Sequence, residues 1–195
     1  MIPVTFVILT GGESSRFGAN KSEIFFDGTT LLLGLLEKLP AGHVVIVGPS
    51  FDQEIRPVQF AREDPIGGGP VAALGAGIQF VRDEFLVLLA TDLPFVSSII
   101  PELLKFLPTD LDAIIPVDNS DRLQTLSGIY RTEALLTALN GMASLTGESM
   151  RNLVSMLKIQ KFPLNAKDAS KLLDIDTPQD LIRAVEIRER ETRKL

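Results

Sequence analysis

The sequence predicts an α/β fold in which helices pack around a mainly parallel sheet. Three short apolar runs have the composition of strands buried on both faces, at 6–9, 43–47 and 85–90. Segments with the apolar spacing of helices lie between them, at about 30–39 and 71–81. Strands that alternate with helices are typical of parallel sheets with helical crossovers. No repeat, low-complexity tract or linker divides the sequence, so we expect a single domain over residues 1–195.

The first half of the chain follows this alternation. After the strand at 6–9 and its loop, Asp27-Gly28 indicates a turn, and Thr29 or Thr30 can cap a helix that Pro40 ends. The strand at 43–47 carries the chain's only histidine, His43, at its start, and we interpret that residue as structural. A short strand is expected at 57–60, before the helix at 71–81.

The second half is predicted with the same rules. A helix at 97–107 should connect the strand at 85–90 to one at 112–117. A further strand at 123–130 is expected to run antiparallel at the edge of the sheet. The remaining elements are two helices, a last strand and a closing helix that Thr177 caps and Pro178 begins, at 132–139, 148–157, 159–162 and from 178 onward.

Composition excludes several classes of protein. Apolar residues make up 45% of the chain and charged residues 23%, which is ordinary for a folded protein. The net charge of −6 argues against nonspecific nucleic-acid binding. The absence of cysteine excludes disulfides and thiolate metal sites. The chain shows neither a signal-peptide pattern nor an apolar run of about 20 residues, so we expect a cytoplasmic protein without a membrane segment.

The loop after the first strand, Thr10–Lys21, is the first candidate for a binding site. Gly11 and Gly12 allow the backbone to approach a ligand closely, and Arg16 and Lys21 supply cationic donors, so the loop can face an anion. Neither common phosphate-binding pattern fits: Lys21 does not follow a glycine directly, and the two glycines are adjacent. On the loop alone, a tight turn without a ligand is the alternative.

Two more segments are expected beside that loop. Asp64 precedes the glycine cluster 67–69, which leads into a helix, and Asp92 directly follows the apolar strand at 85–90. Carboxyl ends of parallel strands share one edge of a sheet, where open α/β folds bind ligands. Asp92 could hold Mg²⁺ against the phosphates of a nucleotide bound by the first loop. The alternatives are a flexible connector for the glycines and a turn-capping role for Asp92.

Four segments, in order along the chain, resemble the MobA-like nucleotidyltransferases, the molybdenum cofactor guanylyltransferases. The first loop resembles the pattern L-x-G-G-x-S-x-R-x-G-x-x-K of that family. The other matches are Glu63-Asp64 with 69–72, 91–95 (Thr-Asp-Leu-Pro-Phe) and 174–181 (Asp-Ile-Asp-Thr-Pro-Gln-Asp-Leu). The resemblance implies a three-layer, Rossmann-like nucleotidyltransferase fold. It also implies Mg²⁺-dependent transfer of GMP from GTP to the terminal phosphate of molybdenum-molybdopterin, releasing pyrophosphate.

The resemblance also implies roles for individual residues. The nucleotide-binding positions are Leu9, Thr10, Gly11, Gly12, Lys21, Asp64 and Asp92. The catalytic positions are Lys21, Arg16 and Asp92. Asp92 falls on the Mg²⁺ aspartate, with Asp176 as a possible second metal contact. Expected partners are GTP and molybdenum-molybdopterin, with transient contact to molybdenum cofactor biosynthesis proteins or molybdoenzymes and no nucleic acid.

The chain departs from the family pattern at several positions. Thr10 replaces the usual alanine, Gly48-Pro49 replaces an asparagine after the second strand, and Asp174 and Asp176 stand where asparagines are frequent. Two alternatives to molybdopterin guanylyl transfer therefore stay open. One is cytidylyl or guanylyl transfer to another acceptor, such as molybdopterin with CTP, a sugar phosphate or phospholactate. The other is a non-catalytic nucleotide-binding accessory protein.

Overall fold

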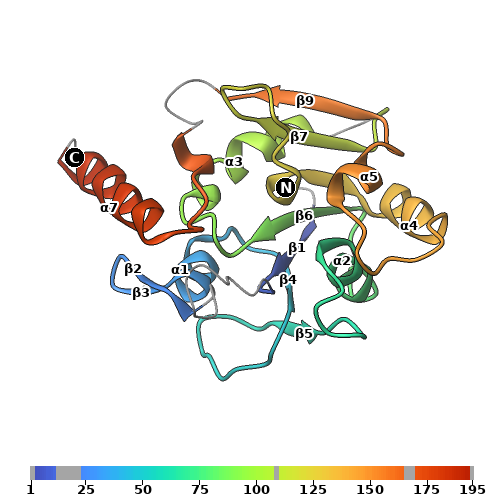
Figure 1. The fold of residues 1–195 in the computed structure, drawn as a ribbon, viewed down its shortest axis with the longest axis horizontal. Coiled ribbons are helices and arrows are strands. Elements are labelled where there is room, and N and C mark those ends of the chain that lie inside the picture. The colour runs from blue at the N-terminus through green and yellow to red at the C-terminus, as the bar shows by residue number, and fades with distance from the viewer. Residues whose placement is uncertain (1–2, 12–22, 108–109, 165–169, 194–195) are drawn as a thin grey trace.

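A computed structural model describes residues 3–11, 23–107, 110–164 and 170–193. Its centre is a seven-stranded sheet in the order β5-β4-β1-β6-β8-β7-β9, which Figure 1 shows between helices. The strands are β1 (Val4–Leu9), β4 (His43–Val47), β5 (Gln59–Ala61), β6 (Phe85–Ala90), β7 (Ala113–Val117), β8 (Ile129–Arg131) and β9 (Ile159–Pro163). A separate hairpin pairs β2 (Phe25–Phe26) with β3 (Thr29–Thr30).

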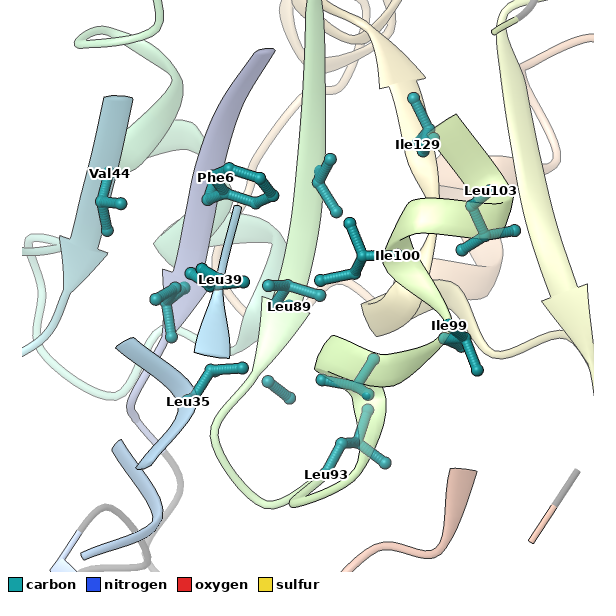
Figure 2. Packing of buried hydrophobic residues seen from close by; sticks show 14 of the residues in the cluster. Phe6, Leu35, Leu39, Val44, Leu89, Leu93, Ile99, Ile100, Leu103 and Ile129 are labelled. Atoms are coloured by element: carbon teal, nitrogen blue, oxygen red, sulfur yellow. The ribbon is translucent and has the colours of Figure 1, made fainter. Parts of the chain in front are cut away.

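Helices cover both faces of the sheet, so the fold has three layers. They are α1 (Leu31–Lys38), α2 (Pro70–Ile78), α3 (Ile100–Leu103), α4 (Thr132–Asn140), α5 (Met150–Val154) and α7 (Pro178–Thr192). One core cluster joins α1 and α3 to the sheet through side chains such as Phe6 and Leu89, as Figure 2 shows. A second cluster joins α2, α4 and α5 to the opposite face. The predicted α/β class, the mainly parallel sheet and its layers are confirmed.

The parallel strands end at one edge of the sheet. β1 pairs in parallel with β4 on one side and with β6 on the other, and β5 adds in parallel to β4. The C-terminal ends of β1, β4 and β6 therefore lie together, as predicted, and we call this side the C-terminal edge. His43 begins β4 and pairs with Thr5, at the opposite end of these strands.

The predicted edge position of the strand at 123–130 is wrong. β8 is antiparallel, as expected, but it lies inside the sheet between β6 and β7. The strand is also shorter than predicted, because Thr125–Ser127 form a 3₁₀ turn before it. Ile129 and Tyr130 are fully buried, one in each core cluster, so both faces of β8 are covered. The edges are β5 and β9 instead.

Two predicted helices are also shorter than expected. The segment 97–107 divides into a 3₁₀ turn (Val96–Ser98), the four-residue α3 and a second 3₁₀ turn (Leu104–Phe106). Pro101 lies in the first turn of α3 and offers no N–H to extend a helix from the preceding residues. In place of a helix at 148–157, α5 begins after Ser149, whose hydroxyl accepts a hydrogen bond from the Asn152 N–H.

A third, smaller core cluster lies where α7 meets the β2–β3 hairpin. Ile24 and Phe26 from the hairpin region pack there with Phe95, Ile175 and Ala184. Phe26 and Phe95 make an edge-to-face contact with ring centroids 5.7 Å apart. This cluster joins three segments near the C-terminal edge that are far apart in sequence. No helix in the described ranges is both long and apolar enough to cross a bilayer.

Candidate active site

The first loop leaves β1 through a firmly held residue. Thr10 is buried, and both its backbone N–H and its hydroxyl donate to the Val47 carbonyl oxygen at 3.0 Å. Gly11 follows and is exposed, which leaves its backbone available to a ligand. Three residues of the predicted site, Gly12, Arg16 and Lys21, lie outside the described residues. The structure therefore places only the start of the loop.

Asp92 follows β6 next to the end of β1. The preceding Thr91 donates its backbone N–H to the Leu9 carbonyl oxygen at 3.3 Å, so the two strand ends stay paired up to the site. The Asp92 carbonyl oxygen in turn accepts a hydrogen bond of 2.9 Å from the Ile175 N–H. The segment Asp174–Asp176 is thereby fixed against Asp92, although more than 80 residues of chain separate them.

The carboxylates of this segment influence one another. The pKa of Asp174 is raised, mainly because the side chain is partly desolvated and then because of the negative charge of Asp176, with a smaller effect from Asp92. A concentration of negative charge of this kind favours a bound cation. Carboxylate oxygens are the donors that Mg²⁺ prefers, and a Mg²⁺ site is commonly completed by substrate phosphates. Asp92 and Asp176 therefore have the right chemistry for the metal.

Those carboxylates do not form a complete metal site by themselves. In the part of the chain that the structure describes, no group of three His, Cys, Asp or Glu side chains is arranged to hold a metal ion. The metal role of Asp92 and Asp176 remains a prediction.

The side chain of Glu63 lies between the glycine cluster 67–69 and the start of the first loop. The Glu63 Oε1 atom accepts a hydrogen bond of 3.2 Å from the Gly67 N–H and lies 3.9 Å from where a Cβ on Gly11 would stand. The turn ends at Gly69, whose φ of 90° favours glycine, and α2 begins immediately after it. Asp64 lies in this turn with an exposed side chain, and its contact with nucleotide remains a prediction.

Two structural contributions at this site were missed in the sequence. Glu63 is predicted only as a member of a motif, yet its carboxylate lies between the two glycine-containing loops. Ile175 has no role in the sequence-based prediction, yet it is fully buried and its N–H donates to the Asp92 carbonyl oxygen. The signal available in the sequence is the alternation of acidic, apolar and acidic residues at 174–176. Such alternation predicts an extended segment that buries one face in a core.

A cavity of about 460 Å³ adjoins the site on the side of Asp174. Its walls come from α7, from the connection between β7 and β8, and from the segment before Asp174. Arg122, Arg183 and Arg190 are among the residues that line it.

Comparison with known proteins decides the family. Residues 6–161 match the family described as the MobA-like NTP transferase domain. The chain belongs to this family. The matched region begins within β1, contains the glycine cluster and Asp92, and ends in β9. It therefore includes the described parts of the site except Asp174–Asp176 and α7.

Individual relatives agree with the assignment. The chain is 30% identical over 142 residues to a probable molybdenum cofactor guanylyltransferase of Mycobacterium tuberculosis, which covers 68% of this chain and 70% of that protein. A protein of the same name from Carboxydothermus hydrogenoformans is 24% identical over 191 residues, or 94% and 96% of the two chains. The structure of molybdopterin-guanine dinucleotide biosynthesis protein A from Archaeoglobus fulgidus superposes with a TM-score of 0.75 at 25% identity, covering 95% of this chain and 99% of that one.

These findings confirm the resemblance and the nucleotidyltransferase fold predicted from the four sequence motifs. The chain is a nucleotidyltransferase by family. The roles of its individual site residues are a separate question, which depends on the geometry described above.

Proposed function

We propose that this MobA-like protein transfers GMP from GTP to the terminal phosphate of molybdenum-molybdopterin and releases pyrophosphate. The observation that carries the proposal is the hydrogen bond between the Ile175 N–H and the Asp92 carbonyl oxygen. It joins the acidic segment 174–176 to the end of β6, beside the start of the first loop. The names of the relatives support guanine as the base and molybdopterin as the acceptor.

The proposed division of roles follows the resemblance of the sequence motifs to those of the family. The backbone at Leu9, Thr10 and Gly11, with Gly12, holds the nucleotide, and Asp64 contacts it from the neighbouring turn. Lys21 and Arg16 neutralise charge on the phosphates, with Arg16 near the departing pyrophosphate. Asp92, with Asp176 as a second contact, holds Mg²⁺, which when bound neutralises charge on the phosphate oxygens.

The chemistry requires little covalent work from the protein. An oxygen of the acceptor phosphate attacks the α-phosphorus of GTP in line, forming a new P–O bond while the bond to the bridging α–β oxygen breaks. Pyrophosphate carries away the electron pair of that bond. Positioning of the two phosphates and stabilisation of charge are the main contributions to such reactions. The absence of cysteine is compatible with this mechanism.

The test is release of pyrophosphate from GTP or CTP with a panel of acceptors. The panel contains molybdenum-molybdopterin, a sugar phosphate and phospholactate, each with Mg²⁺. Release that requires both GTP and molybdenum-molybdopterin supports the proposal. A clear preference for CTP, or for another acceptor, would replace it by transfer to that pair of substrates. Binding of nucleotide without release for any acceptor would indicate an accessory protein.

A further inference from the structure

We propose that the cavity beside Asp174 binds the acceptor, and that Arg122 and Arg183 recognise a flat heteroaromatic ring with an anionic substituent. The inference rests on the proposed function, because that function requires an acceptor phosphate at Asp92. It adds the recognition site for the rest of the acceptor, and both Arg122 and Arg183 lie outside the four sequence motifs.

The shape and lining of the cavity suit a small planar ligand. Its volume of about 460 Å³ lies within the usual range for small-molecule sites, about 300–1,000 Å³. Leu172, Leu173 and Ile187 contribute apolar surface, and Gln124 contributes an amide. Apolar surface with a few polar groups is the usual composition of a site for a ring with polar edges.

The arginines come from two sides of this cavity. Arg183 and Arg190 are seven residues apart on α7, and Ile187 lies between them, so the three share one face of the helix. Arg122 comes from the connection between β7 and β8. A guanidinium presents a rigid fork of donors and can also stack on a planar ring, which a lysine cannot do. Such groups fit a ring that carries acceptor atoms and negative charge.

Three acidic side chains, Asp118, Asp174 and Glu186, also line the cavity, and Glu186 is paired with Arg190 at 3.6 Å, so Arg122 and Arg183 are the cations proposed for the ligand. Asp118 accepts hydrogen bonds from the N–H groups of Ser120 and Arg122 and from the Gln124 side chain, so its carboxylate holds the turn that positions Arg122. Arg183 lies 3.5 Å from Asp180 in an ion pair whose arginine side chain is 68% exposed. Exposed pairs of this kind contribute little to stability, so an anionic ligand can recruit the guanidinium.

The cavity lies next to the proposed reaction centre. Asp174 lines it, and the segment 174–176 is hydrogen-bonded to Asp92 through Ile175. A ring held by Arg122 and Arg183 could therefore extend a phosphate-bearing chain past Asp174 toward Asp92.

The experiment uses the full chain and the fluorescent compound pterin-6-carboxylate, a flat heteroaromatic ring with one carboxylate. Binding is titrated for the unmodified protein and for Arg122→Gln and Arg183→Gln. Arg193→Gln is the matched control, because Arg193 follows the same helix, is paired with Glu189 and does not line the cavity. We expect each cavity variant to weaken binding about tenfold, the effect of one charge-assisted hydrogen bond, and the control to bind normally.

GTP binding is measured in parallel and should be equal in all four proteins. Unchanged pterin-6-carboxylate binding in both cavity variants, or no binding to the unmodified protein, would overturn the inference. Failure of the unmodified protein to bind GTP would instead contradict the proposed function. Arginine-dependent binding of the pterin would still support the cavity in that case, so the two failures are distinguishable.

Discussion

Gly48 lies so close to Thr10 that the two positions act as one structural unit. A Cβ atom on Gly48 would stand 1.8 Å from the Thr10 hydroxyl oxygen, far inside any possible contact. That hydroxyl is fixed by its hydrogen bond to the Val47 carbonyl. The threonine side chain at position 10 therefore occupies the space that a side chain at 48 would need.

This contact predicts a steric coupling that can be measured. Gly48→Ala should lower the free energy of unfolding by about 2 kcal/mol or more, because the core cannot absorb an extra methyl group there without a shift. Thr10→Ala should cost about 1 kcal/mol through its lost hydrogen bond. In the double variant the 1.8 Å contact with the hydroxyl oxygen is absent and the nearest remaining atom is the Cβ at position 10, at 3.2 Å, so the loss should be smaller than the sum of the single losses. The measurement is urea unfolding of all four proteins, analysed as a double-mutant cycle.

Complete rescue is not expected in that cycle. The φ of Gly48 is 155°, which a residue with a side chain rarely adopts, so part of the cost should remain in the double variant. Additive losses would show that the Thr10 hydroxyl and the new methyl group avoid each other.

Asp92 is predicted to be essential for turnover but not for folding. Its backbone carbonyl makes the structural hydrogen bond to Ile175, and a change of side chain leaves that atom in place. Asp92→Ala should therefore lower pyrophosphate release by about 1,000-fold, comparable with the loss of a main electrostatic group. Thermal unfolding should stay close to that of the unmodified protein. An active Asp92→Ala protein would contradict the proposed metal role.

A surface aspartate supplies the control for this change. Asp52 is exposed in the loop between β4 and β5, and Asp52→Ala removes the same charge outside the site. Equal losses in both variants would indicate an effect of net charge and not of the site.

Ile175 is predicted to support both stability and turnover. Ile175→Ala should cost about 2–5 kcal/mol, the usual range for a fully buried isoleucine, because it opens a cavity in the third core cluster. It should also lower the turnover number, since the cluster no longer holds segment 174–176 firmly against Asp92. Stability is measured by urea unfolding and turnover by pyrophosphate release, both well below the unfolding temperature.

Ile78→Ala is the matched control for that variant. Ile78 is a buried isoleucine on α2 in a different core cluster. We expect it to lose stability while retaining turnover per folded molecule. If Ile78→Ala loses turnover equally, the Ile175 effect is one of general stability.

Asp180 is predicted to make the stability of the protein depend on pH. Its carboxylate accepts hydrogen bonds from the Thr177 hydroxyl at 2.6 Å and the Thr177 N–H at 2.9 Å, forming a capping box for α7. The side-chain hydrogen bond from Thr177 is the main cause that lowers the pKa of Asp180 in the folded protein. The carboxylate therefore contributes stability above its ordinary pKa of 3.8, and that contribution is lost as pH falls through the lower folded value.

The test is Asp180→Asn, followed by urea unfolding at several pH values. At pH 7 the variant should be less stable by about 1 kcal/mol, the usual contribution of a cap. As the pH falls below 3.8 the difference should shrink, because Asp180 itself becomes protonated. A difference that does not change with pH would show that the charge of Asp180 contributes nothing to α7.

Local patterns were sufficient to predict much of the fold. The apolar runs that became β1, β4 and β6 are buried on both faces, and continuous apolar sequence is the direct signature of that environment. Their C-terminal edge followed from the handedness of crossovers, and the glycine loops and Asp92 were expected there. The capping of α7 by Thr177 was also visible, because a capping box depends on neighbouring residues alone.

The wrong predictions involve partners that are distant in sequence. The short strand β8 lies inside the sheet because it pairs with both β6 and β7. The residues of β8 do not indicate which strands it pairs with. The burial of Ile129 and Tyr130 is part of the same long-range packing. The break around Pro101 has a local cause, because proline offers no N–H to a helix that begins before it.

The sequence by itself determined the layered α/β class, the nucleotidyltransferase family and the candidate residues of the first loop and of Asp92, because these depend on local periodicity and contiguous motifs. Only the tertiary structure decided which distant segments meet. Thr10 and Gly48 compete for one space, Ile175 fixes two acids against Asp92, and α7 closes a cavity lined by arginine. Each of these depends on contacts made after the chain has folded, where excluded volume and hydrogen bonding act between residues that the sequence does not connect.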